Sequence, residues 1–346
     1  MRRDQLLTTS MTSLPLKLQA QIEHWPLAAP FRISGYTFDV IDVLLVTVES
    51  SQGVGRGEAA GVYYRSDDAP TMLRQIESLR RRIEAGITRD VVQDVLPAGG
   101  ARNALDCALW DLEAKVSGHP AWQTAQIESP KPLRTTFTCG ADHPDRMAAA
   151  ACAYRNSRAI KLKLTGEPAD AARVRAVRAA RPDVWLGVDA NQAFSLDSFW
   201  QLMPAFLEAR VALIEQPFPI GRDALLTGFQ SPIPIAADES AQSLADLPKL
   251  VGRFDVINIK LDKCGGLTEA LAMTRTARAL GLDTMVGNMM GTSLAMAPAF
   301  LLGQLCSVVD LDGPIFLKAD RENSVQYADG FISCPESLWG HANKSG

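Results

Sequence analysis

Residues 159–189 have the sequence AIKLKLTGEPADAARVRAVRAARPDVWLGVD, and this stretch decides the fold. Its two ends, Ala159–Leu164 and Trp185–Asp189, are short and apolar, which predicts buried strands. Between them, Ala169–Ala180 carries small and apolar residues at helical spacing, which predicts a helix. A strand, a helix and a second strand in one short stretch form a unit in which the two strands lie parallel.

The same alternation of strand and helix continues through the chain from about residue 130 onwards. Short apolar segments predict eight strands: Leu133–Cys139, Ala159–Leu164, Trp185–Asp189, Leu213–Glu215, Ile233–Asp238, Val256–Lys260, Asp283–Gly287 and Val308–Asp312. Eight alternating units indicate a closed (β/α)8 barrel of the TIM type, in the α/β class. An open doubly wound sheet is the alternative, but no G-x-G-x-x-G sequence opens a helix here.

The segment before residue 130 has strands first and helices afterwards, which is an α+β layout. The predicted elements are the strands Leu16–Trp25, Phe38–Glu49 and Val54–Ala60 and the helices that start at Asp68, Thr88 and Ala101. Asp68 and Thr88 are good N-caps, and Gly118 ends the third helix. We therefore predict an α+β capping domain at 14–128, a barrel at 129–315 and a C-terminal segment at 316–346 that packs back on the capping domain.

Composition limits the function classes that remain. The chain is 47% hydrophobic, which excludes a disordered protein, and its net charge of −4 gives no sign of nucleic-acid binding. The six cysteines form no C-x-x-C pair and only four histidines are present, so a Cys/His zinc site is not expected. The N-terminus lacks the apolar core of a leader peptide, and no stretch is apolar enough to span a bilayer. We expect a cytoplasmic protein that binds neither nucleic acid nor membranes.

Charged residues stand at the ends of the predicted strands, where the active site of such a barrel lies. Asp189, Glu215 and Asp238 end three neighbouring strands, so their carboxylates are expected to converge. Carboxylates are hard oxygen ligands that suit Mg²⁺, with Mn²⁺ as an alternative, and three of them leave positions for substrate and water. The sequence therefore predicts a divalent metal site.

Lysines are predicted on both sides of this site. Lys161 and Lys163 are two residues apart on one strand and point to the same side, and Lys260 ends a strand across the barrel mouth. Two bases on opposite faces of one carbon are what a racemase or epimerase requires, because one removes the α-proton and the other supplies a proton to the opposite face. The cation would stabilise the enediolate, and the cation and a neighbouring lysine would lower the lysine pKa.

As a set, these segments resemble the enolase superfamily, in particular its muconate-lactonizing-enzyme subgroup. The matching segments are Lys161-Leu162-Lys163, Val188-Asp189-Ala190-Asn191, Ile214-Glu215-Gln216-Pro217, Ala237-Asp238-Glu239-Ser240 and residues 258–266 (NIKLDKCGG). The segment Asp310-Leu311-Asp312-Gly313-Pro314 makes the chain most similar to the dipeptide epimerases, whose best known activity is L-Ala-D/L-Glu epimerisation. The resemblance implies an isomerase that acts on a dipeptide at the mouth of a capped barrel.

The resemblance also implies roles for the residues that match. Asp189, Glu215 and Asp238 would bind Mg²⁺, and Lys163 and Lys260 would form the acid/base pair, with Lys161 beside the substrate carboxylate. The D-x-D pair of Asp310 and Asp312 would hold the α-ammonium group of the dipeptide. Loops of the capping domain around residues 26–34 and 59–66 would close over the substrate.

The second residue of the dipeptide is left open by the sequence. Relatives in the family accept acidic, hydrophobic or cationic side chains there. Arg32 could face a Glu carboxylate, whereas residues 287–291 (GNMMG) carry no charge, and Met289 is expected to line the pocket. L-Ala-L-Glu and a dipeptide with an uncharged or hydrophobic second residue are therefore both retained.

Two other classes of function are also retained. N-acylamino acid racemases, o-succinylbenzoate synthases and muconate cycloisomerases use similar sites, but their substrates have no ammonium group for Asp310 and Asp312 to hold. A non-catalytic barrel that binds a metal or a peptide would have no need of two opposed lysines. A homo-oligomer is left open, since nothing in the sequence identifies an interface.

Overall fold

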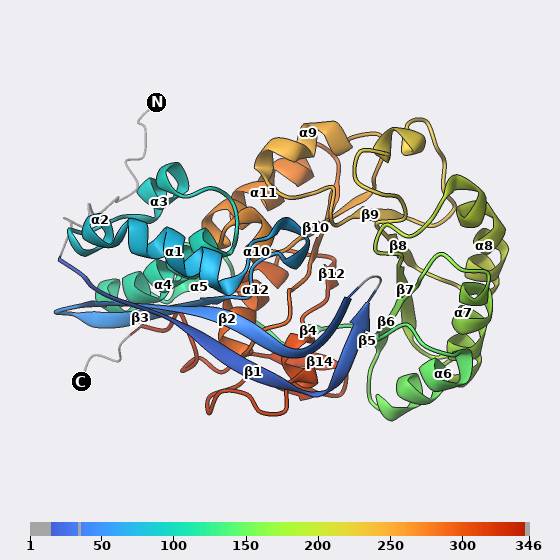
Figure 1. The fold of residues 1–346 in the computed structure, drawn as a ribbon, viewed down its shortest axis with the longest axis horizontal. Coiled ribbons are helices and arrows are strands. Elements are labelled where there is room, and N and C mark those ends of the chain that lie inside the picture. The colour runs from blue at the N-terminus through green and yellow to red at the C-terminus, as the bar shows by residue number, and fades with distance from the viewer. Residues whose placement is uncertain (1–14, 34–35, 343–346) are drawn as a thin grey trace.

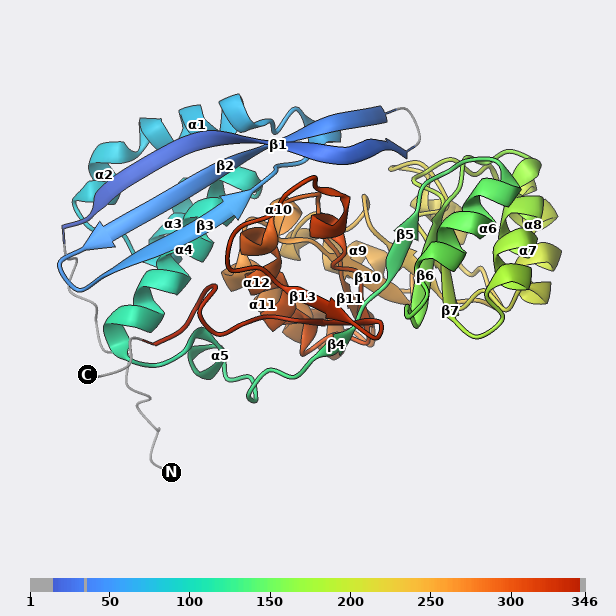
Figure 2. The ribbon, with the colours of Figure 1, turned by 90° about the horizontal axis from the view of Figure 1, so that it is seen from below.

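The computed structural model describes residues 15–33 and 36–342, and it consists of a barrel with a smaller domain beside its mouth (Figure 1). The N-terminal strands and helices form one lobe, and the parallel strands with their surrounding helices form the other. The C-terminal segment, in red, runs from the barrel back to the first lobe (Figure 2).

An antiparallel sheet forms one layer of the capping domain. It consists of β1 (Lys17–Ile33), β2 (Tyr36–Ser50) and β3 (Gly53–Ala59), in that order. The prediction of a loop around residues 26–34 is wrong for residues 26–33. β1 continues through them after a register shift and pairs Phe31 with Phe38. Ser34 lies outside the described residues. β1 is an edge strand, so it can hold Pro26 and Pro30, which have no N–H to donate.

Helices cover the other layer of this domain. They are η1 (Tyr63–Arg65), α1 (Ala69–Ser78), α2 (Arg80–Glu84), α3 (Arg89–Val95), α4 (Gly100–Ser117) and α5 (Ala121–Thr124). The predicted N-caps are confirmed, since Asp68 accepts the N–H of Thr71 at 2.8 Å and Thr88 accepts the N–H of Val91 at 3.4 Å. These carboxylate and hydroxyl oxygens satisfy N–H groups that have no partner within the helix.

Two glycines let α4 lie directly on β3. A Cβ at Gly55 would be 2.1 Å from the carbonyl oxygen of Ala108, and one at Gly57 would be 2.1 Å from that of Ala104. The alternating glycines of β3 therefore set how closely the sheet approaches the helix.

The barrel is a curled sheet of eight parallel strands, and this confirms the predicted fold class. Its strands are β5 (Phe137–Cys139), β6 (Ala159–Lys163), β7 (Trp185–Asp189), β8 (Leu213–Glu215), β9 (Ile235–Ala237), β10 (Val256–Ile259), β11 (Asp283–Val286) and β12 (Val308–Val309), adjacent in chain order. The N–H of Thr136 donates to the carbonyl of Val309 at 3.0 Å, which joins the last strand to the first. Leu133–Cys139 was predicted as one strand, but only its end enters the barrel.

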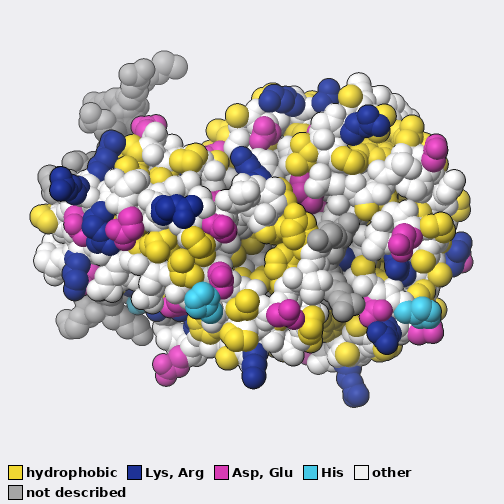
Figure 3. All heavy atoms as spheres, viewed as in Figure 1, with side chains coloured by type: hydrophobic (Ala, Val, Ile, Leu, Met, Phe, Trp, Pro, Cys, Tyr) yellow, Lys and Arg dark blue, Asp and Glu magenta, His cyan; other side chains and the backbone are white. Residues whose placement is uncertain are grey.

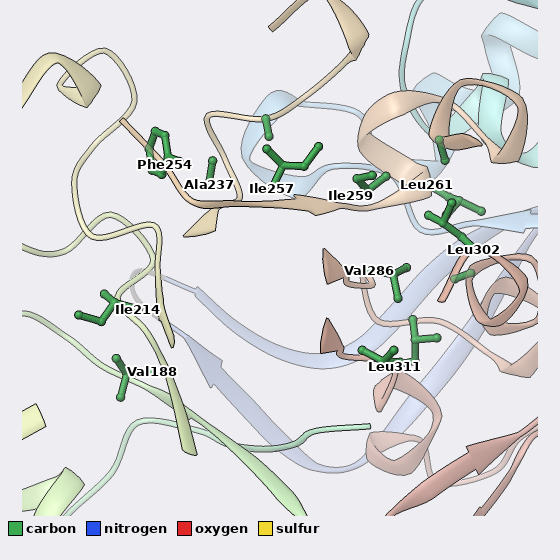
Figure 4. Close-up of a cluster of buried hydrophobic side chains, with 14 of the residues drawn as sticks. Val188, Ile214, Ala237, Phe254, Ile257, Ile259, Leu261, Val286, Leu302 and Leu311 are labelled. Atoms are coloured by element: carbon green, nitrogen blue, oxygen red, sulfur yellow. The ribbon is translucent and has the colours of Figure 1, made fainter. Parts of the chain in front are cut away.

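Helices surround the strands on the outside. They are α6 (Pro144–Ala153), α7 (Ala169–Ala180), α8 (Leu196–Glu208), η2 (Asp223–Leu226), η3 (Leu244–Asp246), α9 (Leu247–Leu250), α10 (Leu261–Cys264), α11 (Leu267–Ala279) and α12 (Ser293–Gly303). Buried side chains of successive strands, such as Val188, Ile214 and Ile257, form one cluster with helix residues such as Leu302 (Figure 4). This packed core holds the strand ends rigidly at the mouth.

The C-terminal segment contains η4 (Gly313–Phe316), β13 (Gln326–Ala328) and β14 (Phe331–Ser333), and β14 pairs with β4 (Leu133–Arg134). Beyond these strands, the indole N–H of Trp339 donates to the carbonyls of Arg56 and Cys107, both at 3.1 Å. These two hydrogen bonds hold the end of the segment against β3 and α4. Among the described helices, none is long and apolar enough to cross a bilayer.

Candidate active site

Three carboxylates meet at the mouth of the barrel. Asp189 and Glu215 are the last residues of β7 and β8, and Asp238 directly follows β9. One oxygen from each lies within 4.8 Å of the others, and all three side chains are buried. The parallel strands bring these oxygens together because their carboxyl ends share one rim.

Hydrogen bonds and nearby charges orient this acidic triad. Asn258 donates its side-chain N–H to Glu215 Oε1 at 2.8 Å, while Glu215 Oε2 is buried and accepts no hydrogen bond from the described residues. Burial, with the charge of Asp189, raises the pKa of Glu215 to about 8. Burial would also raise the pKa of Asp238, but Lys260 and Lys263 lower it below its usual range. Three hard oxygens at this spacing fit a divalent cation, and Glu215 Oε2 still lacks a hydrogen-bond donor.

Lys163 and Lys260 flank the triad on two sides. Lys163, at the end of β6, donates to Asp189 Oδ2 at 2.5 Å, and Lys260, directly after β10, donates to Asp238 Oδ2 at 2.7 Å. β6 and β10 are separated by three strands of the sheet. The two amines therefore approach the triad from opposite parts of the rim.

Lys161 contacts a different carboxylate. Its Nζ donates to Asp310 Oδ2 and lies 3.5 Å from Glu215 Oε2. Burial alone would lower the pKa of Lys161, but the charges of Asp310 and Glu215 raise it well above its usual range. The pKa of Lys260 is raised in the same way, chiefly by Asp238. The charges of the protein's own carboxylates therefore favour the charged form of both Lys161 and Lys260.

Asp310 and Asp312 follow β12 and are buried beside the first strand of the barrel. Asp310 accepts from the hydroxyl of Thr136 as well as from Lys161, and Asp312 Oδ2 accepts the backbone N–H of Thr138 at 2.7 Å. Burial opposes ionisation of both groups. Lys161 nevertheless lowers the pKa of Asp310, whereas burial and the charge of Asp310 raise that of Asp312 to about 6.

A cavity of about 410 Å³ lies between the capping domain and the barrel mouth. Lys163, Lys260 and Asp238 line it from the barrel, together with Met289 of the 287–291 loop. The capping domain contributes aromatic side chains, namely Phe31, Phe38, Tyr63 and Tyr64. Hydrophobic side chains gather on this face along the junction of the two lobes (Figure 3). Lys161, Asp310 and Asp312 lie outside the lining of this cavity. The side chain of Arg32 is outside the described residues.

The structure adds residues to which the sequence analysis gave no role. Lys263, on α10, is fully buried and donates to Asp238 Oδ1 and to the Asp238 carbonyl, both at 2.6 Å, and to the Asn258 carbonyl at 2.9 Å. Gln216 accepts the backbone N–H groups of Asp238, at 2.9 Å, and Ser240, at 3.1 Å. In the sequence, both residues stand close to predicted site residues within the matching segments, and this position could have indicated a role for them.

A buried cluster joins the capping domain to the 287–291 loop. Glu58, on β3, accepts the backbone N–H of Thr292 at 2.7 Å and its hydroxyl, and Thr292 caps α12 directly after the loop. Arg321 of the C-terminal segment donates to Glu58 at 3.0 Å through Nε and to Glu23 of β1 at 2.7 Å through Nη2. Burial raises the pKa of Glu58, and Arg321 opposes the rise. One carboxylate therefore connects the sheet, the loop and the C-terminal segment.

Two family models match the chain. The mandelate racemase/muconate lactonizing enzyme N-terminal domain matches residues 17–124, and the enolase C-terminal domain-like family matches residues 145–340. Together they span most of the chain.

Relatives with a described activity match over nearly their whole length. The chain is 38% identical to the L-Ala-D/L-Glu epimerase of Escherichia coli over 310 residues, which cover 89% of this chain and 96% of that protein. It is 39% identical to the N-acetyl-D-glutamate racemase of a Pseudoalteromonas species over 308 residues, which cover 88% and 96%. Both relatives are isomerases of amino acids or dipeptides.

Solved structures agree with the fold described above. An enolase family member from Agrobacterium tumefaciens, with bound sodium and L-Ala-L-Glu, superimposes with a TM-score of 0.91 at 42% identity, covering 94% of this chain and all of that one. A dipeptide epimerase from Methylococcus capsulatus, in complex with Mg and L-Arg-D-Lys, has a TM-score of 0.86 at 29% identity, covering 93% and 98%.

Proposed function

Because the chain belongs to the mandelate racemase/muconate lactonizing enzyme family of the enolase superfamily, we propose that it is a metal-dependent dipeptide epimerase that inverts the α-carbon of the second residue of L-Ala-L-Glu. The residues proposed to act are Asp189, Glu215 and Asp238 as ligands of Mg²⁺ or Mn²⁺, Lys163 and Lys260 as the acid/base pair, and Lys161, Met289, Asp310 and Asp312 around the substrate.

One observation carries this proposal. Each of the two lysines contacts a different member of the acidic triad, Lys163 through Asp189 and Lys260 through Asp238, and both line one cavity. A substrate α-carbon held above the triad would therefore face one amine on each side. A site that only binds a ligand has no use for this arrangement.

Proton transfer is assigned to the side chains of this chain. A divalent cation, when bound, would act as a Lewis acid on the substrate carboxylate and make the α-proton more acidic. The neutral lysine of the pair takes that proton, and the protonated lysine on the other face delivers one to the same carbon. Lys161, held by Asp310 and close to Glu215, adds positive charge where the substrate carboxylate would lie.

The D-x-D pair supports a substrate with a free ammonium group. Among the described residues, no cation forms an ion pair with Asp312, whose carboxylate is buried. A buried carboxylate is costly unless a positive group is paired with it. The α-ammonium of a dipeptide would supply that group, with Asp310 next to it.

Racemisation of N-acetylglutamate is the second candidate, and it is favoured by the relative from Pseudoalteromonas at 39% identity. An acetylated amine carries no charge and would leave Asp312 without a cation. Substitution of Asp310 and Asp312 by Asn therefore separates the two candidates. Loss of dipeptide turnover supports the epimerase, and unchanged turnover removes its main support.

The preference for a second-position Glu rests on relatives and on one residue of this chain. Among the described residues that line the cavity, the only basic ones are Lys163 and Lys260, which are assigned to proton transfer. Arg32 is our candidate for the partner of the Glu side chain. Arg32→Gln should raise KM for L-Ala-L-Glu and leave KM for L-Ala-L-Leu unchanged.

The experiment that tests the function is incubation with Mg²⁺ in D2O, read by mass spectrometry. The substrates are L-Ala-L-Glu, L-Ala-L-Leu and N-acetyl-L-Glu in parallel. We expect L-Ala-L-Glu to gain one deuterium and to yield the L-Ala-D-Glu epimer. Deuterium in N-acetyl-L-Glu alone would move the protein to the racemases, and no exchange in any compound would favour a non-catalytic barrel.

A further inference from the structure

Unpartnered acceptor atoms are concentrated at the barrel mouth. Among the described residues, the buried side-chain atoms without a hydrogen-bond partner include Glu215 Oε2 and Asn258 Oδ1, which belong to the triad and its support. They also include Asn191 Oδ1 and Glu239 Oε2, which the mechanism above does not use. An acceptor left unpaired in the interior is energetically costly, so each of these atoms calls for a donor.

Asn191 and Glu239 face each other from the loops that follow β7 and β9. Asn191 is two residues after Asp189 and Glu239 is one residue after Asp238, and both line the cavity that holds Lys163 and Lys260. Glu239 is only 3% exposed. The side-chain N–H of Asn191 lies 3.4 Å from Glu239 Oε1, which leaves Asn191 Oδ1 and Glu239 Oε2 as the free acceptors.

The backbone holds both side chains in place. Asn191 has φ of +42°, a left-handed conformation that Asn tolerates, and its N–H donates to Asp189 Oδ1 at 2.8 Å. Gln216 accepts the N–H groups of Asp238 and Ser240, which flank Glu239 in the sequence. The backbone of Asn191 is therefore tied directly to one proposed metal ligand, and the backbone on both sides of Glu239 is fixed next to another.

We propose that Asn191 and Glu239 together hold a water ligand of the cation, by accepting hydrogen bonds from its two O–H groups. The inference rests on the proposed cation site. Among the described residues, the carboxylates whose oxygens lie within 4.8 Å of one another are those of Asp189, Glu215 and Asp238. Glu239 is outside this group, so we do not propose it as a direct ligand. Mg²⁺ usually keeps several waters, and a water on a cation is a strong donor, which suits two unpaired acceptors.

This pair would be a positioning device for the metal. Neighbours that orient metal ligands typically contribute 10–100-fold to metal affinity. Substituting Glu239 should therefore weaken cation binding while leaving the direct ligands in place. The same substitution should not lower the stability of the fold, because it removes a buried carboxylate of which one oxygen has no hydrogen-bond partner.

The test measures Mg²⁺ binding by calorimetry, in the absence of substrate, on the full chain. Glu239→Gln keeps the shape and removes the charge, and Asn191→Gly removes the side chain while keeping the left-handed backbone accessible. We expect the Kd for Mg²⁺ to rise about ten-fold or more in each variant. The double variant should bind Mg²⁺ about as weakly as the weaker-binding single variant, because both acceptors hold the same water.

Asp68→Asn is the matched control. It removes a carboxylate that lines the same cavity, and Asn replaces Asp as an N-cap at little loss. Its Kd for Mg²⁺ should change by less than roughly two-fold, because Asp68 is exposed and screened by solvent. Thermal unfolding without metal should be unchanged in Glu239→Gln.

Three results would overturn the inference. A Kd for Mg²⁺ in Glu239→Gln within two-fold of the wild type shows that the carboxylate does not support the cation. An unchanged Kd with a raised KM places Glu239 on the substrate instead. Additive losses in the double variant show that the two side chains do not share one ligand. Because these titrations use Mg²⁺ alone, they stay informative even if no dipeptide is turned over.

Discussion

Glu58 joins three parts of the molecule, so its substitution by Gln should destabilise the protein more than an ordinary surface change. Glu58 Oε2 accepts from the Thr292 hydroxyl and from Nε and Nη2 of Arg321, and an amide N–H₂ in its place cannot accept any of them. Arg321 keeps Glu23 and is 14% exposed, so only part of its interaction is lost. One or two buried donors left unpaired, at about 1–3 kcal/mol each, give an expected loss of about 3 kcal/mol.

Urea unfolding followed by tryptophan fluorescence measures this loss, because Arg321 lies 5.2 Å from the ring of Trp25. Glu49→Gln is the control, since Glu49 is a half-exposed carboxylate 3.5 Å from Lys17 and should lose less than about 1 kcal/mol. A loss for Glu58→Gln that is no larger than for the control would refute the view that this cluster holds the capping domain on the barrel.

Three further predictions follow from packing and ionisation. Gly57→Ala should destabilise the protein by about 3 kcal/mol or prevent folding, because the new Cβ would lie 2.1 Å from the Ala104 carbonyl, and urea unfolding would detect this. Burial raises the pKa of Asp262 to about 7. The stability that the protonated Asp262 contributes is therefore present below pH 4 and lost as the pH rises through 7. In Asp262→Asn, the free energy of unfolding should decline less between pH 5 and 8 than in the wild type. The pKa of Asp312 is about 6, so its charge forms as the pH rises from 5 to 7, and KM for a dipeptide should fall over that range in the wild type and stay constant in Asp312→Asn.

The sequence predicts this fold well where local patterns decide the structure. The barrel strands are short apolar segments, and three of them end in a charge, with Lys163, Asp189 and Glu215 as their last residues. Period-two alternation and helical spacing are local properties, so they can be recognised without knowledge of distant contacts.

Features that depend on distant contacts were not predicted. The extension of β1 to Ile33 depends on pairing with β2, and the apolar and proline-containing sequence near residue 30 resembles a loop when taken alone. Glu58 contacts Thr292 and Arg321 across more than two hundred residues, and no local pattern marks such a pair. Lys263 sits in a matching segment, but its hydrogen bonds to Asp238 depend on how α10 follows β10.

The measurement that tests the central claim most directly is deuterium exchange in D2O by Lys163→Ala and Lys260→Ala, each assayed by NMR on L-Ala-L-Glu and on L-Ala-D-Glu. Each variant retains one of the two proposed bases. We predict that each exchanges the α-proton of one epimer without inverting it, that the two variants act on opposite epimers, and that the double variant exchanges neither. Inversion that persists in either single variant, or exchange of the same epimer by both, would contradict a mechanism with two opposed lysines.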